Sequence, residues 1–191
     1  EVLLVGNSSS LLNNYAKTID SFNTVFRFNR APLIGYEEHV GTKTSYRILN
    51  NHVFLNIKPG KEYSNQPKSF IKKLKNTNIL RIGPGEAEKI IIKYFEKKNN
   101  KVFLFDYDKA ETIKETLNFN SEKNMSVGAI LISLCVISGV KTNIIGFDLD
   151  TRNVTHYWEK RPKEMSISHD FSYEKSWIRN LVKENIVNSL N

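Results

Sequence analysis

Short runs of β-branched and aromatic residues alternate along this chain with longer helix-like stretches, and this alternation limits its fold more than any other feature. The strand-like runs are Val2–Val5, Thr24–Phe28, Ser45–Leu49, Ile79–Ile82, Val102–Phe105 and Asn143–Phe147. The helix-like stretches are Glu86–Phe95, Lys109–Leu117, Val127–Ser138 and Phe171–Leu190. Such alternation is typical of α/β proteins. The sequence therefore predicts a mostly parallel central sheet flanked by helices.

Two of the helical stretches carry further information about burial. The stretch Val127–Ser138 is apolar on all sides, which predicts a buried helix. The stretch Phe171–Leu190 places apolar residues on one face, which predicts that this face packs on the core; they are Trp177, Ile178, Leu181, Val182 and Ile186. Between Asn50 and Asn78 the chain is polar and interrupted by prolines, so we expect a long surface connection there.

Composition narrows the class of protein but does not choose its function. The 191 residues are 40% hydrophobic and suit one domain, residues 1–191, with a real core. A single cysteine, Cys135, excludes a disulfide scaffold, and the longest apolar run is about half the ~20 residues that a membrane span needs. The net charge of +8 favours an anionic partner, which leaves nucleic acid, a lipid surface and a phosphorylated substrate open.

Two segments are candidates for binding a phosphate or a nucleotide. Gly6, Asn7 and Ser8 follow the first strand, at the edge of an α/β sheet where ligands bind; an ordinary capped turn is an equally good interpretation. Ser126 and Gly128 open the buried helix, whose free N–H groups suit a phosphate or ribose, although plain capping is the commoner role. Neither G-x-G-x-x-G nor a Walker motif is present, so dinucleotide and ATP chemistry lose support.

Acidic and histidine residues provide the remaining candidates. Asp148 and Asp150 form a D-x-D that could hold a divalent metal, or could only order a loop. His156 lies in a polar and aromatic cluster. His169 precedes the last helix, with Glu174 five residues later, so it is either a general base or part of a helix cap. The lysine-rich segments match no nucleic-acid-binding motif and are expected to be solvated.

Taken together, these segments resemble the eukaryotic-type sialyltransferases, glycosyltransferase family 29. The large sialylmotif is matched by Val5–Ser8, Asp20, Asn23, Phe26–Pro32, Gly35–Glu37 and Val40–Thr44. The small motif is matched by Ser126–Gly128, Ile145–Phe147 and Asp150–Arg152. His156–Glu159 resembles motif III, and His169 with Glu174 resembles the very small motif. Each motif alone is weak evidence, but all four occur in the family's order along nearly the whole chain.

The resemblance implies an enzyme with a single-domain, GT-A-like (Rossmann-like) fold. It implies inverting transfer of sialic acid from CMP-sialic acid to a hydroxyl of an oligosaccharide or glycolipid acceptor, with neither a metal nor another cofactor. Carried over by position, His169 would be the general base and His156 would stabilise the departing phosphate. The donor would be bound by Asn7 and Asn29 at the phosphate and sugar, by Ser126 and Gly128 at the cytidine and ribose, and also by Gly6, Ser8, Arg30, Tyr157 and Glu174.

Departures from the family pattern affect the acceptor and the cellular location. Val2 and Gly139 stand where the animal enzymes have bridged cysteines, and Arg30 replaces the usual Gln. These departures favour a bacterial cytoplasmic enzyme over a Golgi enzyme. The charge of +8 suits a position peripheral to the inner membrane, where a lipid-linked, lipopolysaccharide or capsule acceptor would lie. The alternatives are transfer from CMP-Kdo or another nonulosonate, a metal-dependent D-x-D transferase, and a basic nucleic-acid-binding module, although we expect no nucleic-acid partner.

Overall fold

The protein is built on a seven-stranded sheet in which neighbouring strands are parallel. The computed structural model describes residues 1–55, 74, 76–84, 89–150, 156–159 and 168–191. The strands are β1 (Val2–Val5), β2 (Val25–Phe28), β3 (Tyr46–Asn50), β4 (Asn78–Gly83), β5 (Val102–Asp106), β6 (Thr142–Ile145) and β7 (Val187–Ser189). Their order across the sheet is β5-β4-β3-β2-β1-β6-β7. The predicted parallel α/β architecture is confirmed.

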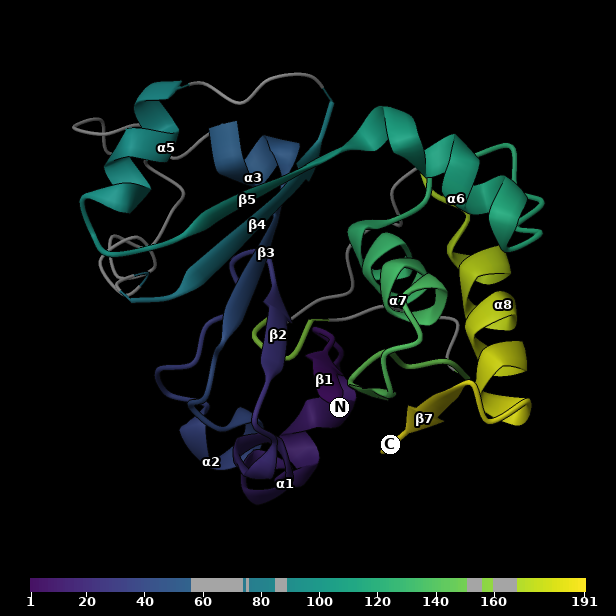
Figure 1. Cartoon of the computed structure of the whole chain (residues 1–191). Coiled ribbons are helices and arrows are strands. Elements are labelled where there is room, and N and C mark those ends of the chain that lie inside the picture. Colours follow the sequence, from purple (N-terminus) through teal and green to yellow (C-terminus); the bar gives the residue numbers. More distant parts are fainter. Residues whose placement is uncertain (56–73, 75, 85–88, 151–155, 160–167) are drawn as a thin grey trace.

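Helices cover both faces of this sheet (Figure 1). One face packs against α6 (Ala110–Thr116), α7 (Val127–Ile137) and α8 (Phe171–Lys183) in the largest apolar cluster. The opposite face packs against η1 (Ser9–Asn13), α1 (Ala16–Ser21) and α2 (Glu37–Val40), and, near β3 and β4, against α3 (Asn51–Leu55) and α5 (Lys89–Glu96). A short 3-10 turn, η2 (Tyr107–Lys109), precedes α6. Among the described residues, no helix is long and apolar enough to cross a membrane.

Helix α7 lies in the core, as its sequence predicts. Six of its residues are buried: Ala129, Ile130, Leu131, Ile132, Ser133 and Cys135. The helix begins where the Ser126 hydroxyl accepts a hydrogen bond from the Ala129 amide at 3.2 Å. It ends at Ile137. Two residues later Gly139 has a left-handed backbone (φ 63°), which lets the amide of Val140 donate to the Cys135 carbonyl in a Schellman motif. The N-terminal end of this helix lies at the carboxyl edge of the sheet, beside the residues that follow β1 and β6.

The prediction of one helix from Phe171 to Leu190 is wrong at its C-terminal end. Helix α8 stops at Lys183, because Asn185 adopts a left-handed conformation (φ 57°) and the Ile186 amide donates to the Leu181 carbonyl. The chain then continues as β7, which pairs with β6. Ile186, expected on the buried face of the helix, is instead 45% exposed.

The connection after β3 also differs from the prediction of a polar surface segment. Its first residues form α3, in which Val53 and Phe54 are buried against β4 and α5. The remainder of this predicted connection lies largely outside the described residues, and the same holds for the beginning of the predicted helix Glu86–Phe95, of which α5 is the described part. Four short helical segments, η1, α1, α2 and α3, were not predicted at all.

The sheet reverses its winding at β1. From β1 to β5 each strand is added on one side, and the chain then returns to place β6 on the other side of β1. Just beyond these two strands, the Gly6 amide donates to the Ile145 carbonyl at 2.7 Å and the Ser8 amide donates to the Gly146 carbonyl at 3.0 Å. In open α/β sheets such a switch point forms the crevice in which ligands bind.

A methyl group at Gly6 should disrupt this switch point. A Cβ there would lie 2.1 Å from the Gly146 carbonyl oxygen, and this neighbour is backbone that cannot rotate away. We expect Gly6→Ala to lower the free energy of unfolding by about 3 kcal/mol, measured by chemical denaturation.

A matched variant separates this contact from a general intolerance of alanine. A Cβ added at Gly139 would have no neighbour within 4 Å. Gly139→Ala should therefore lower the free energy of unfolding only by the cost of a left-handed backbone at alanine, about 1 kcal/mol. Equal losses in the two variants would contradict the close-contact explanation.

Candidate active site

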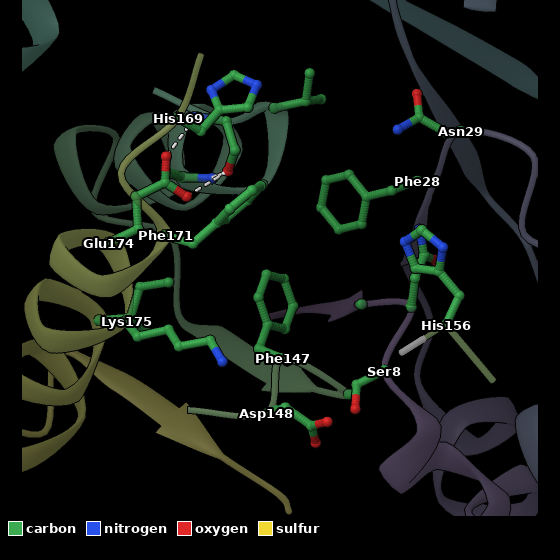
Figure 2. Close-up of a pocket in the computed structure, with 18 of the residues that line it drawn as sticks. Ser8, Phe28, Asn29, Phe147, Asp148, His156, His169, Phe171, Glu174 and Lys175 are labelled. Atoms are coloured by element: carbon green, nitrogen blue, oxygen red, sulfur yellow. Dashed lines mark hydrogen bonds between the residues drawn. The ribbon is translucent and has the colours of Figure 1, made fainter. Parts of the chain in front are cut away.

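A pocket of about 410 Å³ opens at the carboxyl edge of the sheet, at the switch point (Figure 2). Its wall is formed by the segments that follow β1, β2 and β6 and by the N-terminal ends of α7 and α8. Nine of the eleven predicted site residues line it: Gly6, Asn7, Ser8, Asn29, Ser126, Gly128, His156, His169 and Glu174. Predicted residues up to 168 positions apart in sequence (Gly6 and Glu174) thus share one cavity, because the carboxyl ends of parallel strands meet at one edge.

The other two predicted residues, Arg30 and Tyr157, are not among the residues that line the pocket. Tyr157 is buried beside it: its amide donates to the Asn7 carbonyl at 3.0 Å, and its hydroxyl donates to the Pro32 carbonyl. Burial raises the pKa of the Tyr157 phenol to about 12. Through these two bonds Tyr157 holds the Asn7 segment in place.

Two asparagines present amide groups on one side of the pocket. Asn29 has a left-handed backbone (φ 48°), and its side-chain oxygen accepts from the Asn50 amide at 3.0 Å. This bond fixes the orientation of the Asn29 side chain and leaves its NH₂ group as the part that can serve a ligand. The Asn7 side-chain oxygen is buried, and among the described residues it has no hydrogen-bond partner. A buried polar atom of this kind at a pocket wall is typical of a ligand site.

His156 is held on the same side by its own segment. Its ring stacks on Trp158 with 4.6 Å between ring centroids, and its Nδ1 lies 2.9 Å from the Glu159 carboxylate. Its backbone forms an isolated β-bridge with Ser8. Because a carboxylate beside Nδ1 favours a proton on that nitrogen, Nε2 is the ring atom left to interact with a ligand.

His169 lies across the pocket from Asn29 and His156 (Figure 2). Its Nδ1 is 2.9 Å from the Asn124 carbonyl oxygen. A carbonyl can only accept a hydrogen bond, so Nδ1 carries the proton and Nε2 of the neutral ring keeps its lone pair. This tautomer gives His169 the form that a general base requires.

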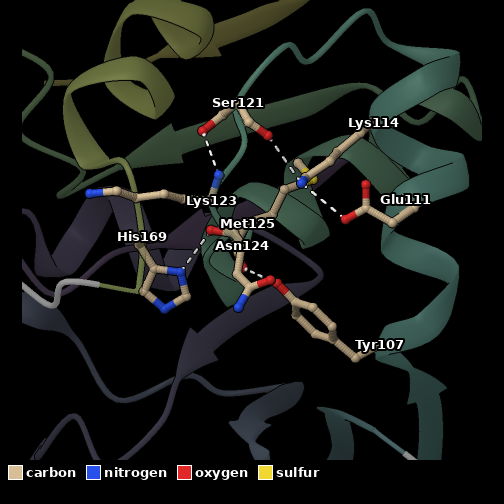
Figure 3. Close-up of polar contacts among 8 residues, drawn as sticks. All are labelled: Tyr107, Glu111, Lys114, Ser121, Lys123, Asn124, Met125 and His169. Carbon is tan, nitrogen blue, oxygen red and sulfur yellow. Dashed lines mark hydrogen bonds and ion pairs between the residues drawn. The ribbon is translucent and has the colours of Figure 1, made fainter.

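The segment that supplies this carbonyl is tied down by α6 and η2 (Figure 3). The Tyr107 hydroxyl donates to the Met125 carbonyl at 2.9 Å. The Lys114 ammonium donates to the Ser121 carbonyl at 3.1 Å and lies 3.0 Å from the Glu111 carboxylate. Burial raises the pKa of the Tyr107 phenol to about 12, so its hydroxyl remains a donor at neutral pH. These bonds fix the segment that carries both the partner of His169 and the cap of α7.

Glu174 joins α8 to the start of α7. Its two carboxylate oxygens accept from the Ser126 amide and the Ser126 hydroxyl, each at 2.6 Å. Burial raises the pKa of this carboxyl, and the two bonds from Ser126 act in the opposite direction. Since Ser126 is fully engaged by Glu174 and Ala129, the first-turn amides of Val127 and Gly128, which no helical carbonyl can satisfy, are the ones available to a ligand.

The structure also adds pocket residues that were not predicted as donor ligands. They include the aromatic residues Phe28, Phe147 and Phe171, and the polar residues Asn50, Asp148 and Lys175. Phe28 and Phe147 stand within the matched motifs but had no predicted role, and Asp148 and Lys175 immediately follow the motif residues Phe147 and Glu174. Asn50 and Phe171 lie outside the matched motifs.

The D-x-D pair does not converge on one point. Asp148 lines the pocket, whereas the Asp150 side chain is 91% exposed and lies 3.7 Å from Arg179. Within the described ranges, no group of three or more His, Cys, Asp or Glu residues is arranged to hold a metal ion.

The chain is also similar in sequence to known proteins. Residues 3–186 match the family model described as glycosyltransferase family 29 (sialyltransferase). The curated CMP-N-acetylneuraminate-beta-galactosamide-alpha-2,3-sialyltransferase 2 of Mus musculus is 24% identical over 159 residues, which cover 82% of this chain and 45% of the relative. The corresponding sialyltransferase 1 of Gallus gallus is 27% identical over 165 residues, covering 82% and 46%. The chain thus spans about half the length of these relatives.

Solved structures share the fold. A mammalian sialyltransferase crystallised with Gal-beta-1-3GalNAc-ortho-nitrophenol has a TM-score of 0.67 and 18% identity, covering 99% of this chain and 68% of that chain. A Campylobacter jejuni sialyltransferase, in complex with a substrate analogue, cytidine-5'-monophosphate, has a TM-score of 0.52 and 15% identity, covering 99% and 78%. Because the family model matches nearly the whole chain, this protein belongs to glycosyltransferase family 29, the sialyltransferase family.

Proposed function

We propose that the protein transfers sialic acid from CMP-sialic acid to a hydroxyl group of a glycan acceptor. One observation carries this proposal: a single pocket brings Asn7, Asn29, the N-terminus of α7 and both histidines together at the switch point of the sheet. Family membership supports the transfer of sialic acid in general. The net charge of +8 is consistent with an anionic donor.

The donor's phosphate would be bound by neutral and cationic donors. Asn7 and the NH₂ group of Asn29, on the side of the pocket that carries His156, would bind its oxygens, while the amides of Val127 and Gly128 at the α7 N-terminus would bind the ribose and cytidine. The doubly protonated form of His156, with Nδ1 facing Glu159, would donate its Nε2 proton to the phosphate oxygen as the bond to the sugar breaks. Because CMP leaves with a single phosphate, such a cradle suffices to stabilise the departing charge, and we propose a metal-independent reaction.

His169 would act on the acceptor. The lone pair of its Nε2 would remove the proton of the acceptor hydroxyl as the oxygen attacks the anomeric carbon. The base and the leaving phosphate lie on opposite sides of the pocket in this arrangement, so attack from the face opposite CMP would invert the anomeric configuration (Figure 2).

Substitution of His169 tests this proposal directly. We expect His169→Ala to lower the transfer rate from CMP-sialic acid at least 100-fold, while CMP binding measured by calorimetry changes little, because the base acts on the acceptor. Wild-type activity should persist in EDTA. The exposed His52, on α3, gives the matched control His52→Ala, which should transfer at the wild-type rate.

Each alternative function predicts a different result in these assays. Full activity of His169→Ala would exclude His169 as the base. Faster transfer from CMP-Kdo than from CMP-sialic acid would show that CMP-Kdo is the donor. A requirement for Mn²⁺ would favour the metal-dependent mechanism. Salt-sensitive binding of RNA or DNA without any thermal shift from CMP would overturn the enzymatic proposal.

Glu174 should make stability depend on pH. Its pKa is raised above the usual 4.5 by burial, so between 4.5 and the raised value the folded protein binds more protons than the unfolded chain, and stability falls as pH rises through this window. Glutamine does not titrate. We therefore expect the wild type to gain stability relative to Glu174→Gln as the pH is lowered from 7 to 4.5, measured by denaturation at each pH.

At pH 7 the same variant should still be less stable, by about 2 kcal/mol, because it loses one of two charge-assisted bonds from Ser126. Glu115→Gln, at an exposed position of α6, is the control and should show neither effect. A pH-independent difference between wild type and Glu174→Gln would contradict the effect of burial on this carboxyl.

A further inference from the structure

Two charged residues of the pocket are not used by the mechanism above. Asp148 follows β6, and Lys175 lies in the first turns of α8; both line the pocket. Figure 2 shows their side chains beside the ring of Phe147, away from Asn29 and His156. The other carboxylate in the lining, Glu174, is engaged by Ser126. Asp148 and Lys175 therefore form a separate polar part of the pocket wall with charges of opposite sign.

The charges of Asp148 and Lys175 influence one another, and the backbone conformation at Asp148 affects where its side chain lies. Burial lowers the pKa of the Lys175 ammonium, and the Asp148 carboxylate acts in the opposite direction. Asp148 is a non-glycine residue with a left-handed backbone (φ 43°). Aspartate and asparagine adopt this conformation more readily than other non-glycine residues, and the other non-glycine residues that adopt it in the described part of the chain are all asparagines. Here it turns the strand end so that Asp148 lines the pocket while Asp150 is exposed.

The chemistry of this pair differs from that of the proposed phosphate site. A phosphate would be repelled by Asp148, and a cation by Lys175. A neutral ligand that presents a hydrogen-bond donor next to acceptors satisfies both side chains at once. The neighbouring Phe147 and Phe171 offer flat apolar surfaces to such a ligand. This combination of an aromatic surface with a paired donor and acceptor suits a nucleobase.

We propose that Asp148 and Lys175 recognise the hydrogen-bonding edge of the donor's cytosine ring. Asp148 accepts from the exocyclic N4 amino group, and Lys175 donates to the N3 and O2 acceptors. Uracil carries an acceptor, O4, in place of the N4 amino group and a donor at N3, so it sets an acceptor against Asp148 and a donor against Lys175. The pair thereby selects a cytidine nucleotide over a uridine nucleotide, and this assignment rests on the proposed use of a CMP-linked donor.

Nucleotide binding by the complete chain tests the pair without any transfer reaction. Calorimetry with CMP, UMP and the nucleoside cytidine should show wild-type CMP binding at least tenfold tighter than UMP binding, since a buried polar group that is left mispaired is strongly disfavoured. Asp148→Asn keeps the size and tolerates the left-handed backbone, but its amide can donate to O4. We expect it to reduce the preference for CMP over UMP about tenfold or more.

Lys175→Met keeps the length of the side chain and removes the charge. It should weaken cytidine and CMP by the same factor, about tenfold, because the lost contact is to the base. A loss confined to CMP would make Lys175 a phosphate ligand and overturn its assignment. The matched control is Asp150→Asn, in the same D-x-D but outside the pocket, which should bind CMP and UMP as the wild type does.

Several outcomes would contradict the proposal, and they are distinct from failure of the proposed function. Equal wild-type affinities for CMP and UMP, or an unchanged preference in a folded Asp148→Asn variant, would exclude base recognition by this pair even if sialic acid is transferred. A wild-type protein that binds neither nucleotide would instead overturn the CMP-dependent function itself. Circular dichroism should be used to check that each variant is folded. If Asp148→Asn does not fold, Lys175→Met still tests base recognition.

Discussion

The close approach of β1 and β6 is the constraint on which the rest of the molecule depends. The Gly6 amide bonds to the Ile145 carbonyl, and a Cβ at Gly6 would overlap the backbone of Gly146. With these strands adjacent, the sheet winds outward in both directions from one point, and the loops beyond them diverge to leave a crevice. The N-termini of α7 and α8 open onto this crevice because their helices pack on the same face of the sheet.

The sequence predicts the fold well wherever local patterns and tertiary packing agree. Six strands and the buried α7 follow from apolar runs, but β7 was hidden because Asn185 ends α8 within an unbroken apolar periodicity. The site was predictable from the order of the motifs, since residues after parallel strands converge on one edge. Which side chains line the cavity was not: Tyr157 lies within a motif yet packs behind Asn7, whereas Asp148 reaches the pocket through a backbone angle that the sequence does not specify.

Buried positive charge supports the side of the pocket that carries Asn29. Arg27 and Arg47 are register partners in β2 and β3, 1% and 4% exposed. Arg27 donates to the carbonyls of Val40 and Lys43, which ties the segment between the strands to the sheet. Burial lowers the pKa of Arg27 to about 10 and that of Arg47 to about 9, so both remain protonated at neutral pH. Charges in a low-dielectric interior extend a positive potential toward an anionic ligand.

The hydrogen bond between His169 and the carbonyl of Asn124 has a consequence for how such a site varies over evolutionary time. The group that selects the tautomer belongs to the main chain, so every amino acid that preserves the local backbone supplies the same acceptor at position 124. Genetic drift can change that side chain freely without moving the proton on the imidazole. The tautomer of His169 therefore depends on the path of the backbone, which Tyr107 and Lys114 hold, and not on which side chain stands at position 124.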